Sequence, residues 1–496
     1  MNYQLVWLKR DLRIHDHAPL LEASQRGPCI VLYVYEPELI ESPEFDSSHV
    51  KFINESLKEL DCRLQNRGGR ITYRVGRIPD VLESLHDQFP LDAIWTHQET
   101  GNKKTYDRDR RVRGWTRDRS ITLNEIPQTG VIRGLEDRDG WADRWESRMN
   151  QPRTSAPDSV TVPTEIDHES PRGLKHFELE NSQKDERQNG GETAARETLR
   201  QFLYERGETY RTDMSSPVTA WDKCSRLSPH LAWGTISIKQ VHQITKKRQD
   251  QLRRRRNEGI NIGSDWLPSL QSFQKRLRWH GHFMQKLEDE PRIEFENLAT
   301  AYDGLREDEF DPELHRAWCE GRTGFPMVDA CMRALHRSGW INFRMRAMLV
   351  SFSSYHLWNH WRKPALHLAK HFLDYEPGIH FPQVQMQSGT TGINSIRIYN
   401  PTKQVHDQDP DGTFIRTYVP ELKDVPKQYL ARPIEMPGYV QRQSGCIIGE
   451  NYPEPIVDAE EAYREARDRI WAVKNSEEAQ QEAKKIYEKH GSRRRN

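Results

Sequence analysis

The alternation of short apolar runs with amphipathic segments in the first 130 residues limits the possible folds more than any other feature. Segments with helical spacing of apolar residues, such as 50–66, separate these runs. Strands joined through helices form parallel sheets, so we predict a doubly wound α/β domain over residues 1–135, which would bind ligands at the carboxyl ends of its strands. The predicted strands are residues 4–8, 30–35, 70–75, 91–96 and 121–126.

The rest of the chain changes character twice. Residues 149–169 are rich in Pro, Ser, Thr and Asp and lack periodicity, so residues 136–195 are predicted to be a long surface linker. From residue 196 to 496 helical spacing dominates, which predicts an all-α domain. Its main predicted helices are residues 237–256, 268–287, 311–320, 326–338, 342–361, 364–373 and 459–490.

Composition excludes several classes of protein. The 74 basic residues balance the 74 acidic ones, so the chain is not a globally basic DNA-coating protein. No apolar run approaches the roughly 18 residues that span a bilayer. Six scattered cysteines without a CxxC pair indicate neither a zinc ribbon nor an iron–sulfur cluster. No signal peptide is recognisable, so we expect a cytoplasmic protein.

Charged residues follow the first predicted strand. Lys9, Arg10, Asp11 and Arg13 come where a doubly wound sheet binds ligands, although no glycine-rich phosphate loop is present. The alternative is a solvated loop.

Two serines flank a predicted helix start. The hydroxyls of Ser225 and Ser228, with the backbone N–H groups there, could hold a pyrophosphate. Simple N-capping explains the same residues equally well.

Two arginines lie beside a strongly apolar helical segment. Arg344 and Arg346 need anionic partners if they are buried, and Asp374 or Glu376 could supply them. These acids could also hydrogen-bond a cofactor, and a purely structural ion pair is the alternative.

Two histidine pairs, His356/His360 and His367/His371, have the i,i+4 spacing of metal ligands on a helix. Without an HExxH motif or a third ligand, we predict no metal site. The basic run 246–256 could contact nucleic-acid phosphates, or it could be a solvated helix face.

Taken together, these segments resemble the photolyase/cryptochrome flavoprotein family, specifically a divergent bacterial-type photolyase. The resemblance covers essentially the whole chain, and the stretch W-C-E-G-x-T-G-F-P-x-V-D-A is its most specific part. Lys9 replaces an arginine of the opening motif, and Cys224 replaces a threonine of the flavin loop. The matching segments, in family order, are residues 7–13, 225–229, 318–330, 397–401 and 414–422.

The resemblance implies an α/β antenna domain, a linker and a helical domain that holds FAD. A second antenna chromophore, a folate or a deazaflavin, would bind the first domain. Tyr210, Ser225 and their neighbours would hold the flavin phosphates and ribitol, and Arg346 would pair with Asp374 near the phosphate or flavin ring. The implied FAD-binding residues are Tyr210, Ser225, Arg226, Leu227, Ser228, His282, Arg346, Asp374, Glu376 and His380.

The activity that the resemblance implies is light-dependent DNA repair. After blue-light excitation, reduced FAD would pass an electron to a pyrimidine dimer, of the cyclobutane type, that has flipped out of UV-damaged DNA. Trp279 would stack on the lesion and Arg344 would reach its phosphates or bases; His380 and Met386 complete the implied catalytic set. A monomer would bind DNA mainly through phosphates and this one lesion.

The sequence departs from the family pattern at several of these positions. His380 stands where the family has asparagine, Met386 where it has a second stacking tryptophan, and Val384 where it has the inner tryptophan of an electron-transfer chain. Trp361 aligns with the middle tryptophan of that chain. Trp318 is the nearest candidate for the outermost one, and Tyr399 is a possible substitute donor.

Two alternatives to a cyclobutane-dimer photolyase stay open. A cryptochrome, which senses light and repairs little, would explain the departures, although the chain ends soon after the family core. A (6-4) photolyase would need paired histidines in the substrate pocket, and His280, His282 and His380 are the candidates.

Overall fold

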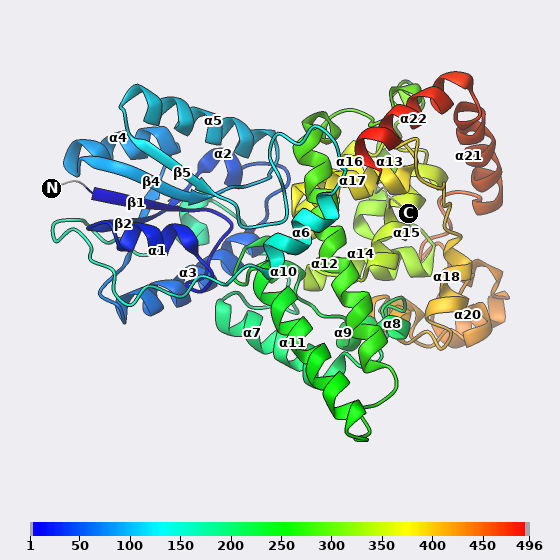
Figure 1. Ribbon diagram of the computed structural model, residues 1–496. Helices are drawn as coiled ribbons and strands as arrows, with labels where there is room; N and C mark the ends of the chain where they lie inside the picture. Colours follow the sequence, from blue (N-terminus) through cyan, green and yellow to red (C-terminus); the bar gives the residue numbers. More distant parts are fainter. Residues whose placement is uncertain (1–2, 492–496) are drawn as a thin grey trace.

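The computed structural model, which describes residues 3–491, places a five-stranded parallel sheet at the start of the chain (Figure 1). The strand order is β3-β2-β1-β4-β5 and all pairs are parallel, so the order in which the chain adds strands switches sides between β1 and β4. Each predicted strand is confirmed to within one residue at either end. The strands are β1 (Tyr3–Leu8), β2 (Cys29–Tyr35), β3 (Ile71–Val75), β4 (Leu91–His97) and β5 (Thr122–Ile126).

Helices cover both faces of this sheet because its side chains alternate in direction. Leu5 and Trp7 of β1 point to the face covered by α4 and α5, whereas Val6 and Leu8 point to α1 and α3. Both layers are buried, as expected for a parallel sheet. These helices are α1 (Ala18–Ser24), α3 (Ser47–Gln65), α4 (Ile78–Gln88) and α5 (Lys103–Asp118).

The predicted linker is more ordered than its composition indicated. It begins with helix α6 (Trp141–Asn150), whose Trp145 is buried in the core of the helical domain. Residues 151–191, here called the strap, then run along the α/β domain. The strap is fastened there by backbone hydrogen bonds, such as Val160 N–H to the Arg67 carbonyl (2.8 Å), and by the buried side chain of Val160.

The C-terminal part is helical as predicted, although the helix Pro377–Ser388 and several shorter helices were not predicted. Two of the predicted helices also differ from those observed. The predicted helix 342–361 ends at Ser351 and continues as a π-helical turn, and the predicted helix 459–490 is two helices. The helices are α7 (Glu192–Gln201), α8 (Tyr210–Asp213), α9 (Ala220–Lys223), α10 (Ser228–Ala232), α11 (Ile238–Asn257), α12 (Trp266–Asp289), α13 (Pro312–Glu320), α14 (Pro326–Ser338), α15 (Phe343–Ser351), α16 (Arg362–His371), α17 (Pro377–Ser388), α18 (Pro401–Gln408), α19 (Thr413–Tyr418), α20 (Gly438–Ser444), α21 (Ala459–Lys474) and α22 (Glu477–His490).

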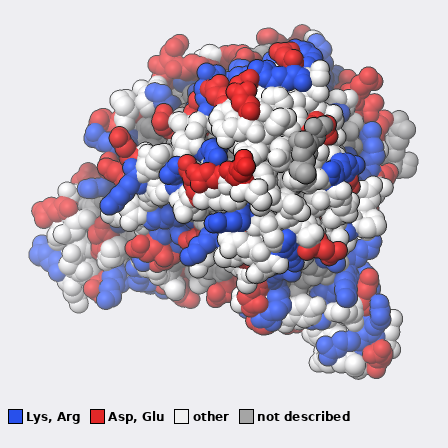
Figure 2. All heavy atoms as spheres, turned by 90° about the vertical axis from the view of Figure 1, so that its left-hand side faces the viewer, with Lys and Arg blue, Asp and Glu red and all other residues white. Residues whose placement is uncertain are grey.

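Charge does not separate into large surfaces of one sign on the side of the α/β domain. Figure 2 shows basic and acidic side chains intermingled there. The exposed arginines 253–256 lie at the end of α11, which projects at the bottom of Figure 1. Within residues 3–491, no helix is long and apolar enough to cross a membrane.

Helix α17 lies at the centre of the helical domain, against α12 and α15. Its approach to α12 depends on Gly378, where an added Cβ would lie 2.6 Å from Met284 Sδ and 3.0 Å from Met284 Cα. The second of these atoms is backbone, so the overlap could not be relieved by a side-chain rotation alone.

We therefore expect Gly378→Ala to lower the free energy of unfolding by about 1–3 kcal/mol, as overpacking does. Gly438→Ala is the control: this glycine also begins a helix, but a Cβ there meets only the Arg442 guanidinium at 3.5 Å. Chemical denaturation of both variants measures the difference, and equal stabilities would contradict the close approach.

Candidate functional site

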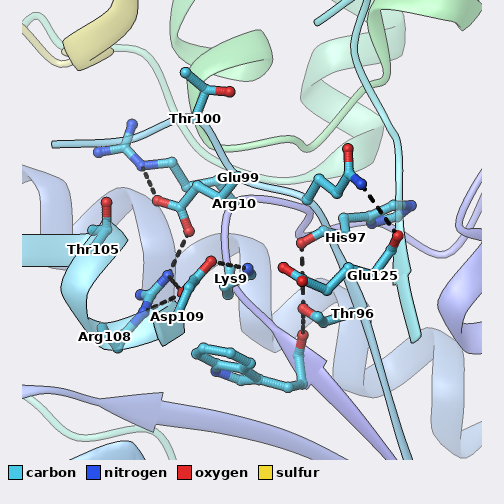
Figure 3. A network of polar contacts seen from close by, with 12 residues as sticks. Lys9, Arg10, Thr96, His97, Glu99, Thr100, Thr105, Arg108, Asp109 and Glu125 are labelled. Carbon is cyan, nitrogen blue, oxygen red and sulfur yellow. Dashed lines mark hydrogen bonds and ion pairs between the residues drawn. The ribbon is translucent and has the colours of Figure 1, made fainter. Parts of the chain in front are cut away.

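The charged loop after β1 is buried, so the alternative of a solvated loop is wrong. Lys9 Nζ lies 2.9 Å from Asp109 Oδ2, and Arg108 bridges Asp109 and Glu99 at 2.8 and 2.7 Å (Figure 3). Burial opposes ionisation, yet Lys9 and Arg108 together lower the pKa of Asp109. The network fixes the carboxyl ends of β1 and β4, the two neighbouring strands between which the strand order switches sides.

Two arginines of this loop cross to the helical domain. Arg10 donates to the Tyr375 carbonyl (2.8 Å) and lies over the Trp233 ring (4.4 Å). Arg13 donates to the Gly234 carbonyl (2.9 Å). Gly234 has φ of +66°, and an added Cβ would lie 2.1 Å from the Arg10 carbonyl oxygen. Close backbone contact thus joins the two domains here.

The segment 372–376, here called the acidic segment, carries Asp374 and Glu376. Side chains from other segments hold its backbone by hydrogen bonds. The two carboxylates are thereby positioned and stay available for other partners. Three donors bind its carbonyls: His49 Nε2 to Phe372 (2.9 Å), Trp233 Nε1 to Leu373 (2.8 Å) and Arg10 to Tyr375.

The structure brings Arg346 and Asp374 together as predicted. Two parallel hydrogen bonds of 3.0 and 2.8 Å join the guanidinium to the carboxylate. A third, from Arg346 Nε to the Ile341 carbonyl (2.8 Å), and the Phe372 ring at 4.0 Å fix the guanidinium further. Such a fork leaves one orientation for both groups.

Glu376 has a different partner, His280 of α12. The His280 Nε2 and Glu376 Oε2 atoms are 2.9 Å apart. Burial disfavours the charged form of each group, but the attraction between the two groups is larger than this effect. The pKa of His280 is therefore raised and that of Glu376 is lowered. The two groups therefore form an ion pair once His280 is protonated, as the pH falls from the alkaline range.

The predicted flavin loop contains a strained residue. Arg226 has φ of +60°, and its guanidinium lies over the adjoining rings of Trp221 (4.6 Å) and Trp340 (4.0 Å). These two cation–π contacts offset the backbone strain. Ser225 and Ser228 flank it, and Ser228 begins the short helix α10.

One arginine connects the loop region to the exposed surface. Burial raises the pKa of Tyr210 and the nearby Arg276 opposes this shift; Arg276 also lies over the Trp279 ring at 4.5 Å. Tyr210 and Leu227 are buried in the same core, whereas the Trp279 side chain is 51% exposed. Trp279 is therefore a flat surface supported from one side.

The other predicted catalytic residues lie on α17 and on the neighbouring helix α15. Arg344 of α15 is half-buried, and its Nε has no partner. Met386 is half-buried on α17. His380 is buried, and its Nε2 lies 2.8 Å from the Ala365 carbonyl, so Nε2 is the donor. Burial lowers the pKa of His380 to about 4, which leaves Nδ1 as an acceptor at neutral pH.

Two predictions do not fit these positions. His282 follows His280 by two residues, so it lies on the other side of α12, against Trp141. Trp318 is fully buried beside His367, with no ring contact to Trp361 among the described residues, which does not suit the outermost donor of an electron chain. Trp361 is also fully buried.

Tyr399 is only half-buried, and its backbone N–H donates to the hydroxyl of Ser351 at the end of α15 (3.0 Å). Asn342, the residue before α15, has a structural role that no sequence motif indicated. Its amide donates to the Met214 and Ser215 carbonyls (3.1 and 2.7 Å), which ties α15 to the loop after α8. Its position directly before an arginine-bearing helix was the available signal.

A separate pocket opens at the carboxyl ends of β1 and β2. It measures about 820 Å³ including its open mouth, and it reaches the helical domain at Trp233 and Tyr375. Aromatic rings and charged groups share its walls, among them Tyr33, Tyr35 and Glu36. This is the position at which doubly wound sheets bind ligands.

Two family models match the chain. "DNA photolyase" matches residues 4–134, and "FAD binding domain of DNA photolyase" matches residues 273–472. The first covers the sheet with its charged loop, and the second covers the paired residues of α12, α15 and the acidic segment. The chain therefore belongs to the photolyase/cryptochrome family.

Individual relatives span nearly the whole chain. A deoxyribodipyrimidine photo-lyase of Agrobacterium fabrum is 28% identical over 95% of this chain and 98% of its own length. A cryptochrome DASH of Natronomonas pharaonis is 25% identical over 94% and 100%. The crystal structure of a class III photolyase from Agrobacterium tumefaciens superposes with a TM-score of 0.83 at 26% identity, covering 96% of this chain and 98% of that one.

The cofactor of this family domain is FAD, and the residues present fit it. Among the described residues, three unpartnered buried polar atoms belong to α12 and to the start of α15, which carry His280 and Arg346: the donors His280 Nδ1 and Arg344 Nε, and the acceptor Asn342 Oδ1. A ligand with both anionic acceptors and N–H donors, as FAD has, would suit such a set. Arg346 with Asp374, and the serines beside Arg226, are the residues that would hold it.

The His280–Glu376 pair generates a prediction about pH. Because the pKa of His280 is raised from 6.5 on folding, the pair stabilises the protein fully below about pH 6.5 and less as the pH rises through the raised value. Glu376 stays ionised over this range because its pKa is lowered from 4.5.

We expect His280→Gln to lower the free energy of unfolding more at pH 6 than at pH 9. His406→Gln, an exposed histidine on α18, should show no such difference. Urea unfolding of both variants at the two pH values measures this, and an equal loss for His280→Gln at both would refute the ion pair.

Proposed function

We propose that the protein is a light-dependent DNA-repair enzyme that splits cyclobutane pyrimidine dimers in UV-damaged DNA with FAD as cofactor. The observation that carries this proposal is Trp279, a half-exposed indole held flat by Arg276 on the helix that also bears His280. An exposed aromatic face beside cations is suited to stacking on an extruded base.

When bound, FAD would supply light-driven one-electron chemistry. The protein's part is to bind and orient. Asp374 would hold Arg346 in place beside the cofactor, and Glu376 would keep His280 charged. Arg344, with its unpartnered Nε, is placed to meet a phosphate or a base of the lesion.

The pocket at the sheet edge supports a second, light-harvesting chromophore. Its aromatic walls and charged rim suit a folate or deazaflavin better than a nucleotide phosphate, because the chain lacks a glycine-rich loop there. Trp233 and Tyr375 line the pocket; Tyr375 belongs to the acidic segment and Trp233 donates to its backbone, so this chromophore would lie near the flavin domain.

A cryptochrome is the second candidate, and the altered substrate contacts favour it. Met386 stands where the family has a second stacking tryptophan, so Trp279 would be the one aromatic ring of that pair left to stack on a lesion. The (6-4) photolyase has less support: His280 is bound to Glu376, His380 to Ala365, and His282 lies on the far side of α12.

The repair prediction is direct. The reduced, FAD-loaded protein should restore a thymine-dimer oligonucleotide under blue light and leave it unchanged in the dark. Product formation is measured by chromatography, with a (6-4) oligonucleotide in parallel. Absence of repair on both lesions, with flavin reduction by light intact, would instead support the cryptochrome.

We expect Trp279→Ala to weaken lesion binding by about 1–3 kcal/mol, the value of one stacked base, and to change binding of undamaged duplex much less. Trp471→Ala, a similarly exposed tryptophan on α21, is the matched control. Fluorescence-anisotropy titrations measure both affinities. Equal losses on damaged and undamaged DNA would leave Trp279 without a role in lesion recognition.

A further inference from the structure

Three histidines of the helical domain, none of them among the predicted flavin residues, meet at one point. His336 comes from α14, and His367 and His371 come from successive turns of α16. One ring nitrogen from each lies within 4.8 Å of the other two. The i,i+4 pair was visible in the sequence, but the third histidine comes from a different helix, which only the fold brings near.

The rings are packed together without satisfying one another. The ring centroids are 4.3 Å apart for His336 and His371, 4.6 Å for His367 and His371, and 5.7 Å for His336 and His367. Each imidazole has a buried nitrogen with no hydrogen-bond partner: Nε2 of His336, Nε2 of His367 and Nδ1 of His371. Three orphaned acceptors or donors in one place are costly unless something binds them.

A metal ion is the ligand that suits three neutral imidazoles. Burial lowers the pKa of His336 to about 4 and that of His367 to about 3, so their lone pairs are free at neutral pH. Tetrahedral zinc with Zn–N bonds of about 2.0–2.1 Å needs nitrogens about 3.3 Å apart. Small side-chain rotations would close the remaining distance.

The charged side chains around the cluster are mainly cations, with one acid, Asp46, among them. Lys184 of the strap and Lys370 of α16 face it, and Arg333 of α14 lies near His336. Lys184, which acts on all three rings, is itself paired with Asp46 at 2.8 Å, so its charge is partly neutralised. On the remaining side, the Trp318 ring packs on His367 at 5.6 Å.

We propose that His336, His367 and His371 form a binding site for one divalent transition-metal ion, zinc in the first place, with water as the fourth ligand. The ion would fasten the end of α16 to α14. His371 precedes the acidic segment directly, so this fastening would support the segment that carries Asp374. The proposal does not depend on light, DNA or repair.

The test uses the flavin-loaded protein after dialysis against a chelator. Isothermal titration with Zn²⁺ should give about one ion per chain. His367→Gln and His371→Gln should each weaken binding by more than about tenfold, since even loss of an outer partner costs that much. His406→Gln should bind as the unchanged protein does. Retained flavin absorbance and circular dichroism confirm that each variant is folded.

Cobalt provides a second readout of the same site. Co²⁺ should give the intense visible bands of a four-coordinate ion, after subtraction of the flavin spectrum, and His336→Gln should abolish them. No saturable Zn²⁺ binding to the unchanged protein would overturn the proposal. So would binding that the three histidine variants leave intact.

Discussion

The Arg10 guanidinium makes the contacts that join the two domains and position the backbone of the site. It starts from the ion network at the edge of the sheet, lies over Trp233, and donates to the carbonyl of Tyr375. That carbonyl lies between the two carboxylates of the acidic segment. The sheet therefore sets the backbone from which Asp374 reaches Arg346, and a residue in the first strand's loop controls a side chain more than 300 positions later.

Sequence patterns predicted the fold well where one period dominates. All five strands were found: β1, β2 and β4 are buried, largely apolar runs, whereas the edge strands β3 and β5 are more polar and less buried. Helix α5 was missed, since its charged residues hide a stripe of only a few buried side chains, among them Val112 and Trp115. Helix α17 was missed because Pro377, Gly378 and Pro382 favour a loop locally, while packing against α12 holds the helix.

Those parts of the site that lie in local sequence motifs could be predicted from the sequence. The Arg346–Asp374 pair followed from the resemblance, and its geometry is the expected fork. Sequence alone could not show that Arg276 supports Trp279, that His280 binds Glu376, or that a third histidine joins the α16 pair. Each of these contacts joins elements whose relative placement only the packed fold determines, and burial of the loop after β1 is a tertiary property as well.

The strap also changes how the two domains are connected. It is bound along its length: Thr154 to Asp16, Val160 to Arg67, and Gly190 to Glu55. The non-covalent contacts between the domains therefore do not depend on the peptide chain that connects them. A backbone break within residues 151–191 would leave two fragments with their contacts at Arg10, Arg13 and His49 unchanged. The chain is in this sense a natural candidate for a split protein whose halves recognise each other without the peptide bond between them.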